Sequence, residues 1–155
     1  MCGFTGSVSI KPIDITLIEE ANKFIECRGP DSKCFIEKKY NTYNLNFCFN
    51  RLSILDLSEE ANQPMYSKDF NTMVMFNGEI YNHKELTAQY ASDYEFKTKS
   101  DCEVILPLFE QFGPEFIDNL KGMFAFVLYD DTTGNYLIAR DHMGIIPLYT
   151  GFDEH

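Results

Sequence analysis

The chain has 155 residues, a formal net charge of −11 and a hydrophobic content of 45%. That length fits one domain of ordinary size, and the apolar content is sufficient for a core. The acidic balance disfavours nucleic acid or an anionic membrane as a main partner, because binding phosphate groups needs clustered Lys and Arg. The longest apolar run, 123–129, falls well short of the roughly 20 residues of a membrane-spanning helix, and we expect no secretory signal.

The cysteines and histidines follow no known disulfide or metal-binding spacing. No Cys-x-x-Cys pair occurs, and the cysteine count is odd. We therefore expect neither a disulfide framework nor a metal site, and we interpret the cysteines as reduced thiols in a cytoplasmic protein. The cysteines are Cys2, Cys27, Cys34, Cys48 and Cys102.

The chain begins with a predicted strand followed by a predicted helix. Residues 3–10 alternate small, apolar and polar side chains, which indicates a strand. Apolar residues then recur at helical spacing, with Thr16 and Glu19 as a capping box and residues 28–30 as the stop. The apolar positions of this helix are Leu17, Ile18, Ala21, Phe24 and Ile25.

Further strands are predicted in the middle of the chain. Residues 34–55 indicate strands joined through a polar turn near Asn41. Residues 72–76 indicate another short strand, which should end at residues 77–78.

The last third predicts one helix and a hairpin. The helix should begin at Ser100, with Glu103 completing a capping box, and Pro107 should kink the helix or shift its start. Residues 123–129 and 136–140 indicate a hairpin across a polar turn. Strands outnumber helices and do not alternate regularly with them, so we expect an α+β fold with mostly antiparallel sheets.

Cys2 is the first candidate for chemistry. A lone cysteine is most often a small buried hydrophobe, but removal of Met1 would give Cys2 a free α-amine. Because α-amines titrate near neutral pH, one residue would supply both the nucleophilic thiol and the proton acceptor, with no histidine required.

Asn77 and Gly78 follow an apolar strand and admit two interpretations. Asn-Gly is the commonest hairpin turn, but the chain continues through residues 79–83 in a sequence unlike a return strand. The other interpretation is an oxyanion hole, in which a side-chain amide and a backbone N–H donate to one developing negative charge. Glycine would also let the backbone approach a substrate closely.

Arg51 and Asp101 are candidate contacts for a zwitterionic ligand. Arg51 is either a solvated edge residue or a partner of Asp56, or its planar guanidinium grips a carboxylate through two hydrogen bonds. Asp101, in the first turn of a predicted helix, either complements the helix dipole or binds a substrate ammonium group.

Six segments stand out in chain order: residues 1–6 (MCGFTG), 28–31 (RGPD), 51–56 (RLSILD), 77–82 (NGEIYN), 100–103 (SDCE) and 140–149 (RDHMGIIPLY). Together they resemble the N-terminal glutaminase domain of glutamine-hydrolysing asparagine synthetases, a class II glutamine amidotransferase with the N-terminal-nucleophile fold. The resemblance covers essentially the whole chain.

The resemblance implies a four-layer αββα sandwich with two mostly antiparallel sheets between helices. It implies a glutaminase domain over residues 2–155 that is truncated at the C-terminus, with the closing strands missing after His155. The ATP-dependent synthetase domain of the family is expected to be absent, because the sequence carries no Gly-rich pyrophosphate loop.

The resemblance also implies residue roles. Cys2 would attack the side-chain amide of L-glutamine and form a γ-glutamyl thioester, with its own α-amine as base and then as acid. Asn77 and Gly78 would hold the oxyanion. The implied L-glutamine-binding residues are Arg51 for the α-carboxylate, Asp101 with Glu79 for the α-ammonium, Leu52 and Ile54 along the backbone, and Asn77 and Gly78.

Two positions depart from the family pattern. Cys27 stands where a histidine usually precedes the RGPD segment, and Phe49 replaces a histidine two residues before Arg51. Neither position has a chemical role in the family, so we expect altered packing or loop geometry and no loss of activity.

The implied function is the release of glutamate and ammonia from glutamine, with the ammonia meant for ATP-dependent amidation of aspartate to asparagine. No cofactor is expected in this chain; ATP and Mg²⁺ would belong to a synthetase domain from the same gene or a separate chain. Expected partners are L-glutamine and that synthetase domain, with a homodimer as an option for the full-length protein.

Alternatives remain open. The chain could be a truncated, non-catalytic glutamine-binding or interaction module, or a glutaminase subunit that serves another acceptor. Phosphoribosylpyrophosphate and glucosamine-phosphate amidotransferases are rival relatives, but their segments match the RGPD and NGEIYN segments less well.

Overall fold

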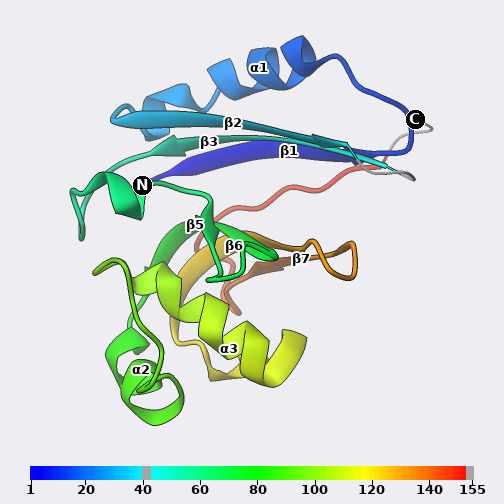
Figure 1. Ribbon diagram of the computed structural model, residues 1–155. Helices are drawn as coiled ribbons and strands as arrows, with labels where there is room; N and C mark the ends of the chain where they lie inside the picture. The colour runs from blue at the N-terminus through cyan, green and yellow to red at the C-terminus, as the bar shows by residue number, and fades with distance from the viewer. Residues whose placement is uncertain (40–42, 153–155) are drawn as a thin grey trace. The chain divides into compact units, whose positions relative to one another are not determined.

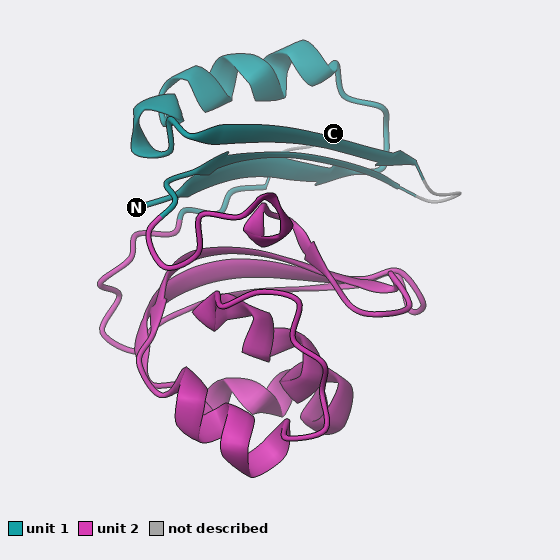
Figure 2. Cartoon of the chain, turned by 60° about the vertical axis from the view of Figure 1, so that its left-hand side comes forward, with its two compact units in different colours: residues 1–53, 149–155 teal, residues 54–148 magenta. Residues whose placement is uncertain are grey.

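The computed structural model describes residues 1–39 and 43–152. The chain divides into two compact units, residues 1–53 with 149–155 and residues 54–148 (Figure 2). The expected turn near Asn41 and the chain end at His155 lie outside the described residues. Both units contain an antiparallel sheet and helices, which confirms the predicted α+β class.

Unit 1 is a three-stranded antiparallel sheet in the order β1-β3-β2, with helix α1 packed on β1 and β3 (Figure 1). The central strand β3 is buried along its whole length. The register places Gly3 opposite Asn50 and Ser32 opposite Arg51. The start of β1 and the end of β3 therefore lie at the same end of the sheet. The elements are β1 (Gly3–Ser9), α1 (Ile15–Lys23), the 3-10 helix η1 (Glu26–Arg28), β2 (Ser32–Lys39) and β3 (Asn44–Arg51).

The start of α1 differs from the prediction. Asp14 is the N-cap, and its carboxylate accepts a hydrogen bond from the Thr16 N–H at 3.0 Å. These hydrogen bonds from Thr16 lower the pKa of Asp14. The predicted capping box of Thr16 and Glu19 is therefore wrong, because an acidic side chain two residues earlier already satisfies a free N–H of the first turn.

The buried face of α1 also differs from the apolar positions. Ile18 and Asn22 are buried, whereas Leu17 and Phe24 are exposed. Asn22 is buried because its side-chain amide pairs reciprocally with Asn50 of β3, at 3.1 Å and 2.6 Å. The apolar pattern did not predict Asn22 as a buried residue, because its amide can be buried only when it is hydrogen-bonded to a partner such as Asn50.

Unit 2 contains a four-stranded antiparallel sheet in the order β4-β5-β6-β7. Strands β6 and β7 form the predicted hairpin. Helix α2, which the sequence did not predict, follows β5. The elements are the 3-10 helix η2 (Glu59–Ala61), β4 (Met65–Tyr66), β5 (Thr72–Ile80), α2 (His83–Tyr90), the 3-10 helix η3 (Asp101–Val104), α3 (Ile105–Phe112), the 3-10 helix η4 (Gly113–Asn119), β6 (Gly122–Asp130) and β7 (Asn135–Arg140).

The second predicted helix is present but begins later than expected. Ser100 makes no capping hydrogen bond through its side chain, and Glu103 accepts hydrogen bonds from Lys97 and Thr98, so the predicted capping box is wrong. The α-helix starts at Ile105 after a 3-10 turn. Pro107 therefore lies in the first turn, where an N–H has no intrahelical partner to lose.

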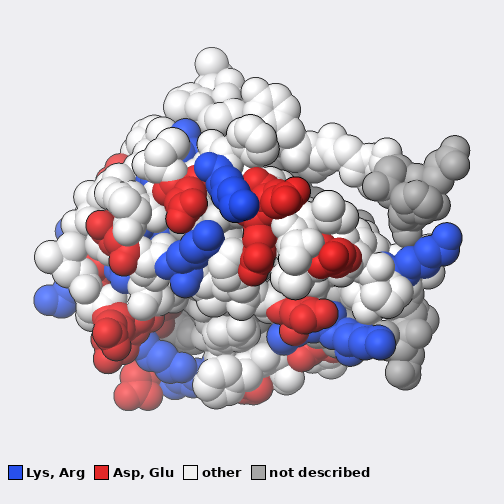
Figure 3. Space-filling view, turned by 90° about the horizontal axis from the view of Figure 1, so that it is seen from above, with Lys and Arg blue, Asp and Glu red and all other residues white. Residues whose placement is uncertain are grey.

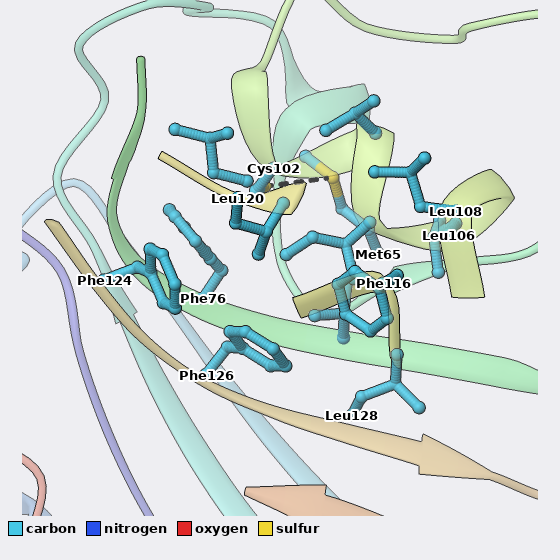
Figure 4. Close-up of a cluster of buried hydrophobic side chains, with 14 of the residues drawn as sticks. Met65, Phe76, Cys102, Leu106, Leu108, Phe116, Leu120, Phe124, Phe126 and Leu128 are labelled. Atoms are coloured by element: carbon cyan, nitrogen blue, oxygen red, sulfur yellow. Dashed lines mark hydrogen bonds between the residues drawn. The ribbon is translucent and has the colours of Figure 1, made fainter. Parts of the chain in front are cut away.

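The core of unit 2 lies between the sheet and helix α3 and is rich in aromatic side chains (Figure 4). The rings of Phe76, Phe124 and Phe126 are stacked or tilted with centroids 5.8–6.5 Å apart. Phe116 of η4 packs on Phe126 at 5.9 Å. This cluster fixes the middle of β5, directly before Asn77.

On the face shown in Figure 3, acidic and basic side chains of the described residues lie interspersed. The basic groups on that face do not gather into one large patch. Within residues 1–39 and 43–152, every helix is too short or too polar to cross a lipid bilayer.

Candidate functional site

Cys2 directly precedes β1 and is partly buried. The Leu52 backbone N–H donates to the Cys2 Sγ at 3.4 Å, and the Leu52 carbonyl oxygen lies 3.7 Å from the same sulfur. The Arg28 Nε–H donates to the Cys2 carbonyl oxygen at 3.1 Å. The thiol and the backbone of Cys2 are thus held from two different segments.

The RGPD segment fastens the end of β3. A Cβ on Gly29 would overlap the backbone of β3, so only glycine fits there. Pro30 forms a β-bridge with Arg51, and the Asp31 N–H donates to the Arg51 carbonyl oxygen at 3.0 Å. The Asp31 carboxylate accepts the Ser53 N–H at 2.7 Å. The sequence identified this segment as a family motif and as the end of the first predicted helix, but it did not predict these contacts with the end of β3.

Arg51 is the last residue of β3 and is only 7% exposed. The interpretation as a solvated edge residue is therefore wrong. A buried guanidinium binds a carboxylate more strongly than an exposed one, because less water competes for its N–H groups. Since Gly3 lies opposite Asn50, Cys2 and Arg51 lie at the same end of the sheet.

The backbone groups of β5 alternate between two neighbours. Strand β6 pairs with β5 along its whole length, but β4 covers only the beginning of its other edge. On the β6 side, the Asn71 carbonyl oxygen accepts the Asp131 N–H at 2.6 Å. On the β4 side, the Thr72 N–H donates to Ser67 Oγ at 3.0 Å. Even-numbered residues of β5 therefore point their N–H groups toward the β4 side.

Beyond the end of β4, side chains accept the backbone N–H groups along this edge of β5. The Phe76 N–H donates to Gln63 Oε1 at 2.6 Å, and the Ile80 N–H donates to Asp101 Oδ2 at 2.6 Å. Gly78 lies between them, so the alternation points its N–H to the same edge. The interpretation of residues 77–78 as a hairpin turn is wrong, because β5 continues through them to Ile80.

Gly78 and Asn77 both lie in unusual environments on β5. Gly78 has a φ of 142°, and a Cβ there would overlap the Met123 carbonyl oxygen of β6. Asn77 is 5% exposed, and its buried Oδ1 has no hydrogen-bond partner. An unpaired buried amide is costly, and rotation of the amide group exchanges its oxygen and nitrogen. Asn77 can therefore offer either end to a ligand.

Asp101 is the first residue of η3 and is 5% exposed. Burial raises the pKa of its carboxyl group, while the hydrogen bond from the Ile80 N–H opposes that rise. A positively charged ligand would relieve the cost of this buried carboxylate. Glu79, which directly precedes Ile80 on β5, is exposed.

The structure distributes the predicted residues over both units. In unit 1 it brings Cys2, Arg51 and Leu52 together. Unit 2 contains Asn77, Gly78 and Glu79 on β5 and Asp101, which accepts the Ile80 N–H at the end of that strand. It also contains Ile54, which is 68% exposed. Three residues were not predicted as part of the site: Arg28, Asp31 and Gln63.

The two residues that depart from the family pattern differ in burial. Cys27 is exposed in η1, and Phe49 is 1% exposed within β3. All five cysteines are free thiols. Burial raises the pKa of Cys48 to about 11 and also raises the pKa of Cys34.

A family model described as a glutamine amidotransferase domain matches residues 1–155. Asparagine synthetase B (glutamine-hydrolyzing) of Escherichia coli strain K12 is 46% identical over 158 residues, which cover 100% of this chain and 28% of that protein. Asparagine synthetase (glutamine-hydrolyzing) 2 of Oryza sativa subsp. japonica is 39% identical, covering 98% of this chain and 25% of that protein. The chain thus spans about a quarter of the length of these relatives.

The fold is also found in a solved structure. Glutamine phosphoribosylpyrophosphate amidotransferase from B. subtilis, complexed with ADP and GMP, matches with a TM-score of 0.67. The match covers 91% of this chain and 37% of that one, at 18% sequence identity. At that identity the match shows a shared fold only. The family model over the full length shows that this chain belongs to the glutamine amidotransferase domain family.

Proposed function

We propose that the chain hydrolyses L-glutamine to glutamate and ammonia through a thioester on Cys2. The main support is the arrangement around Cys2. Its thiol is partly buried, the Leu52 N–H donates to it, and the buried Arg51 lies at the same end of the sheet. Membership of the glutamine amidotransferase domain family supports glutamine as the substrate.

The nucleophile and the proton transfers of the proposed chemistry come from Cys2 and one water molecule alone. After removal of Met1, the α-amine takes the thiol proton, and the thiolate adds to the amide carbon of glutamine. The C–N bond breaks as the ammonium group returns the proton to the leaving nitrogen, which departs as ammonia. Water, deprotonated by the same amine, then attacks the thioester carbon; the C–S bond breaks, glutamate leaves, and the ammonium group returns its proton to the Cys2 thiolate.

The remaining predicted residues receive roles that their environments support. The Gly78 N–H and the Asn77 amide stabilise the oxyanion of the tetrahedral intermediate. Arg51 binds the α-carboxylate of glutamine as a buried cation. Asp101, with Glu79, binds the α-ammonium, because a buried carboxylate with a raised pKa gains most from a positive ligand. The backbone around Leu52 and Ile54 lines the substrate.

The ammonia acceptor is proposed from the relatives, which are named glutamine-hydrolyzing asparagine synthetases. We propose that a synthetase domain, in the same or a separate chain, uses the ammonia to amidate aspartate. ATP and Mg²⁺ would bind there, and the glutaminase reaction would need no cofactor. We further propose a cytoplasmic location and a homodimer for the full-length protein.

The direct test measures ammonia and glutamate released from glutamine by the purified chain. Cys2→Ala should abolish the release, whereas Cys27→Ala should leave it unchanged, because the Cys27 side chain is exposed. Turnover that persists in Cys2→Ala would overturn the mechanism. Mass spectrometry should find Met1 removed; a retained Met1 in an active preparation would exclude the α-amine of Cys2 as the base.

The same preparations separate the alternatives. Glutamine binding by calorimetry without any turnover of the unsubstituted chain would support a non-catalytic glutamine-binding module. Turnover that is unaffected by aspartate and ATP when a synthetase domain is added would support another ammonia acceptor.

A further inference from the structure

Gln63 makes an unusual contact with β5. Its Nε2 donates to the Phe76 carbonyl oxygen at 3.1 Å, and its Oε1 accepts the Phe76 N–H at 2.6 Å. One side chain thereby satisfies both backbone groups of one strand residue. Gln63 is 8% exposed, so water competes little for these two hydrogen bonds.

The contact continues the sheet beyond the end of β4. The last ladder pair between β4 and β5 joins Met65 and Val74. Gln63 lies two residues before Met65, and Phe76 lies two residues after Val74. The side-chain amide of Gln63 therefore occupies the place of the next hydrogen-bonded pair of the ladder.

Gln63 is itself held in one orientation. Its Nε2 lies 3.8 Å from Cys102 Sγ, which in turn lies 3.5 Å from Met65 Sδ (Figure 4) and 3.3 Å from Ser100 Oγ. Cys102 follows Asp101, the residue that anchors Ile80. The two anchors on either side of Gly78 are thus tied to the same buried cluster.

We propose that Gln63 is a positioning residue that fixes the direction of the Gly78 N–H. The proposal rests on the proposed function of Gly78 as an oxyanion donor. Gly78 has no side chain to pack, so its peptide group is held by its neighbours Phe76 and Ile80 and by β6. Without the hydrogen bonds between Gln63 and the Phe76 backbone, the Gly78 N–H would move from its position. Misplacement of a catalytic group by about 1 Å can lower the rate about 10²-fold.

The experiment compares the glutaminase kinetics of Gln63→Leu with those of Ser67→Ala. Gln63→Leu removes both hydrogen bonds with little change in volume, and kcat should fall roughly 10- to 100-fold with little change in KM, because the oxyanion exists only after attack. Ser67 caps the same strand edge at Thr72, six residues from Gly78, so Ser67→Ala should lower stability while kcat stays within about twofold. An unchanged kcat in Gln63→Leu, or an equal fall in both variants, would overturn the proposal.

A second variant distinguishes positioning from general destabilisation. In Gln63→Glu, the introduced carboxyl group can both accept from the Phe76 N–H and donate to its carbonyl oxygen only when it is protonated. The kcat of this variant relative to the unsubstituted chain should therefore rise as the pH is lowered, whereas the ratio for Gln63→Leu should stay flat. A flat ratio for both variants would contradict the proposed pairing.

A binding measurement adds a readout independent of turnover rate. An aldehyde analogue of glutamine forms a tetrahedral adduct with a thiolate, so its affinity should fall in Gln63→Leu by about the same factor as kcat/KM, while glutamate affinity should not change. If the unsubstituted chain shows no turnover, the proposed function fails. Amide hydrogen exchange at Phe76 and Gly78 then still tests the pairing, and unchanged protection in Gln63→Leu would exclude it.

Discussion

Asp101 anchors Ile80: its Oδ2 accepts the Ile80 N–H at 2.6 Å, although burial raises the pKa of the same carboxyl group. A carboxylate kept in such a place costs stability when it is charged and unpaired. We expect the buried Asp101 carboxylate to bind a cationic group of the substrate.

Asp101→Asn should separate the two effects. The folded-state pKa of Asp101 is raised, so the charged form destabilises the fold above that pKa, and the penalty disappears as the pH falls through it. At neutral pH the variant should melt at an equal or higher temperature, since an amide oxygen can still accept the Ile80 N–H. The KM for glutamine should rise by about tenfold or more, as expected when one partner of a buried ion pair is lost.

Asp118→Asn is the control for this experiment, because Asp118 is exposed and the substitution changes the net charge equally. It should alter neither the melting temperature nor KM. A clearly lower melting temperature for Asp101→Asn at neutral pH would show that the carboxylate mainly stabilises the fold.

Gly78→Ala should be destabilising and inactive. The added methyl group would overlap the Met123 carbonyl oxygen, and a φ of 142° is unfavourable for alanine. We expect a loss of about 2 kcal/mol or more in the free energy of unfolding, measured by chemical denaturation. Gly151→Ala, where a Cβ meets no atom within 4 Å, should change neither stability nor turnover. Wild-type activity in Gly78→Ala would refute the role of its backbone.

The Asn22–Asn50 amide pair should show strong coupling in a double-mutant cycle. Either single change to leucine leaves a buried amide unpaired and should cost about 1–3 kcal/mol. The double substitution should cost less than the sum, because both buried polar groups disappear together. Additive free energies of unfolding would show that the two amides do not depend on each other.

The thiols should react with iodoacetamide in an order set by exposure and pKa. Cys2 and Cys27 should be modified first at pH 8, because Cys27 is exposed and Cys2 is partly accessible. Cys48 should remain unmodified, since burial raises its pKa to about 11 and leaves almost no thiolate. Peptide mass mapping after a timed reaction checks the order, and early labelling of Cys48 in the folded chain would contradict it.

Asp141→Asn should destabilise unit 2 at neutral pH. The Asp141 carboxylate accepts hydrogen bonds from the N–H groups of Phe124, Met143, Ile145 and Ile146. Burial alone would raise its pKa, but these four donors outweigh burial and lower it. The folded-state pKa lies below the unfolded one, so the stabilisation is present above the unfolded pKa and is lost as the pH falls through the folded pKa.

The expected loss for Asp141→Asn is about 2 kcal/mol at neutral pH, the scale of hydrogen bonds to a charged acceptor. The difference from the unsubstituted chain should shrink in denaturation experiments at acidic pH. A difference that does not change with pH would show that the charge of Asp141 is unimportant.

The sequence predicted most strands because their apolar patterns are continuous. It also identified the family from six short segments, and the family comparison confirms that identification. The helix ends were predicted less well. Asp14, and not Thr16, is the N-cap of α1. Several polar residues near the start of a helix can cap it, and the path of the backbone decides which one does.

The supporting residues of the site were beyond prediction for a different reason. Gln63 is a single polar residue in an irregular segment, and its partner Phe76 contributes only backbone atoms. No pattern of side chains can reveal a side-chain-to-backbone pair of this kind. Arg28 and Asp31 belong to a motif that the sequence identified, but their contacts with the Cys2 and Ser53 backbones depend on how the chain folds.

The alternation along β5 makes the length of this strand a constraint on chemistry. Gln63 and Asp101 both contact even-numbered residues of β5, Phe76 and Ile80, whereas the backbone groups of odd-numbered residues point toward β6. Deleting one residue between Phe76 and Ile80 would turn the remaining donors toward the wrong neighbour, whatever side chains were kept. Related chains should therefore tolerate insertions in the loops around this strand. Within the strand, they should tolerate only insertions or deletions of an even number of residues, which preserve the two-residue alternation.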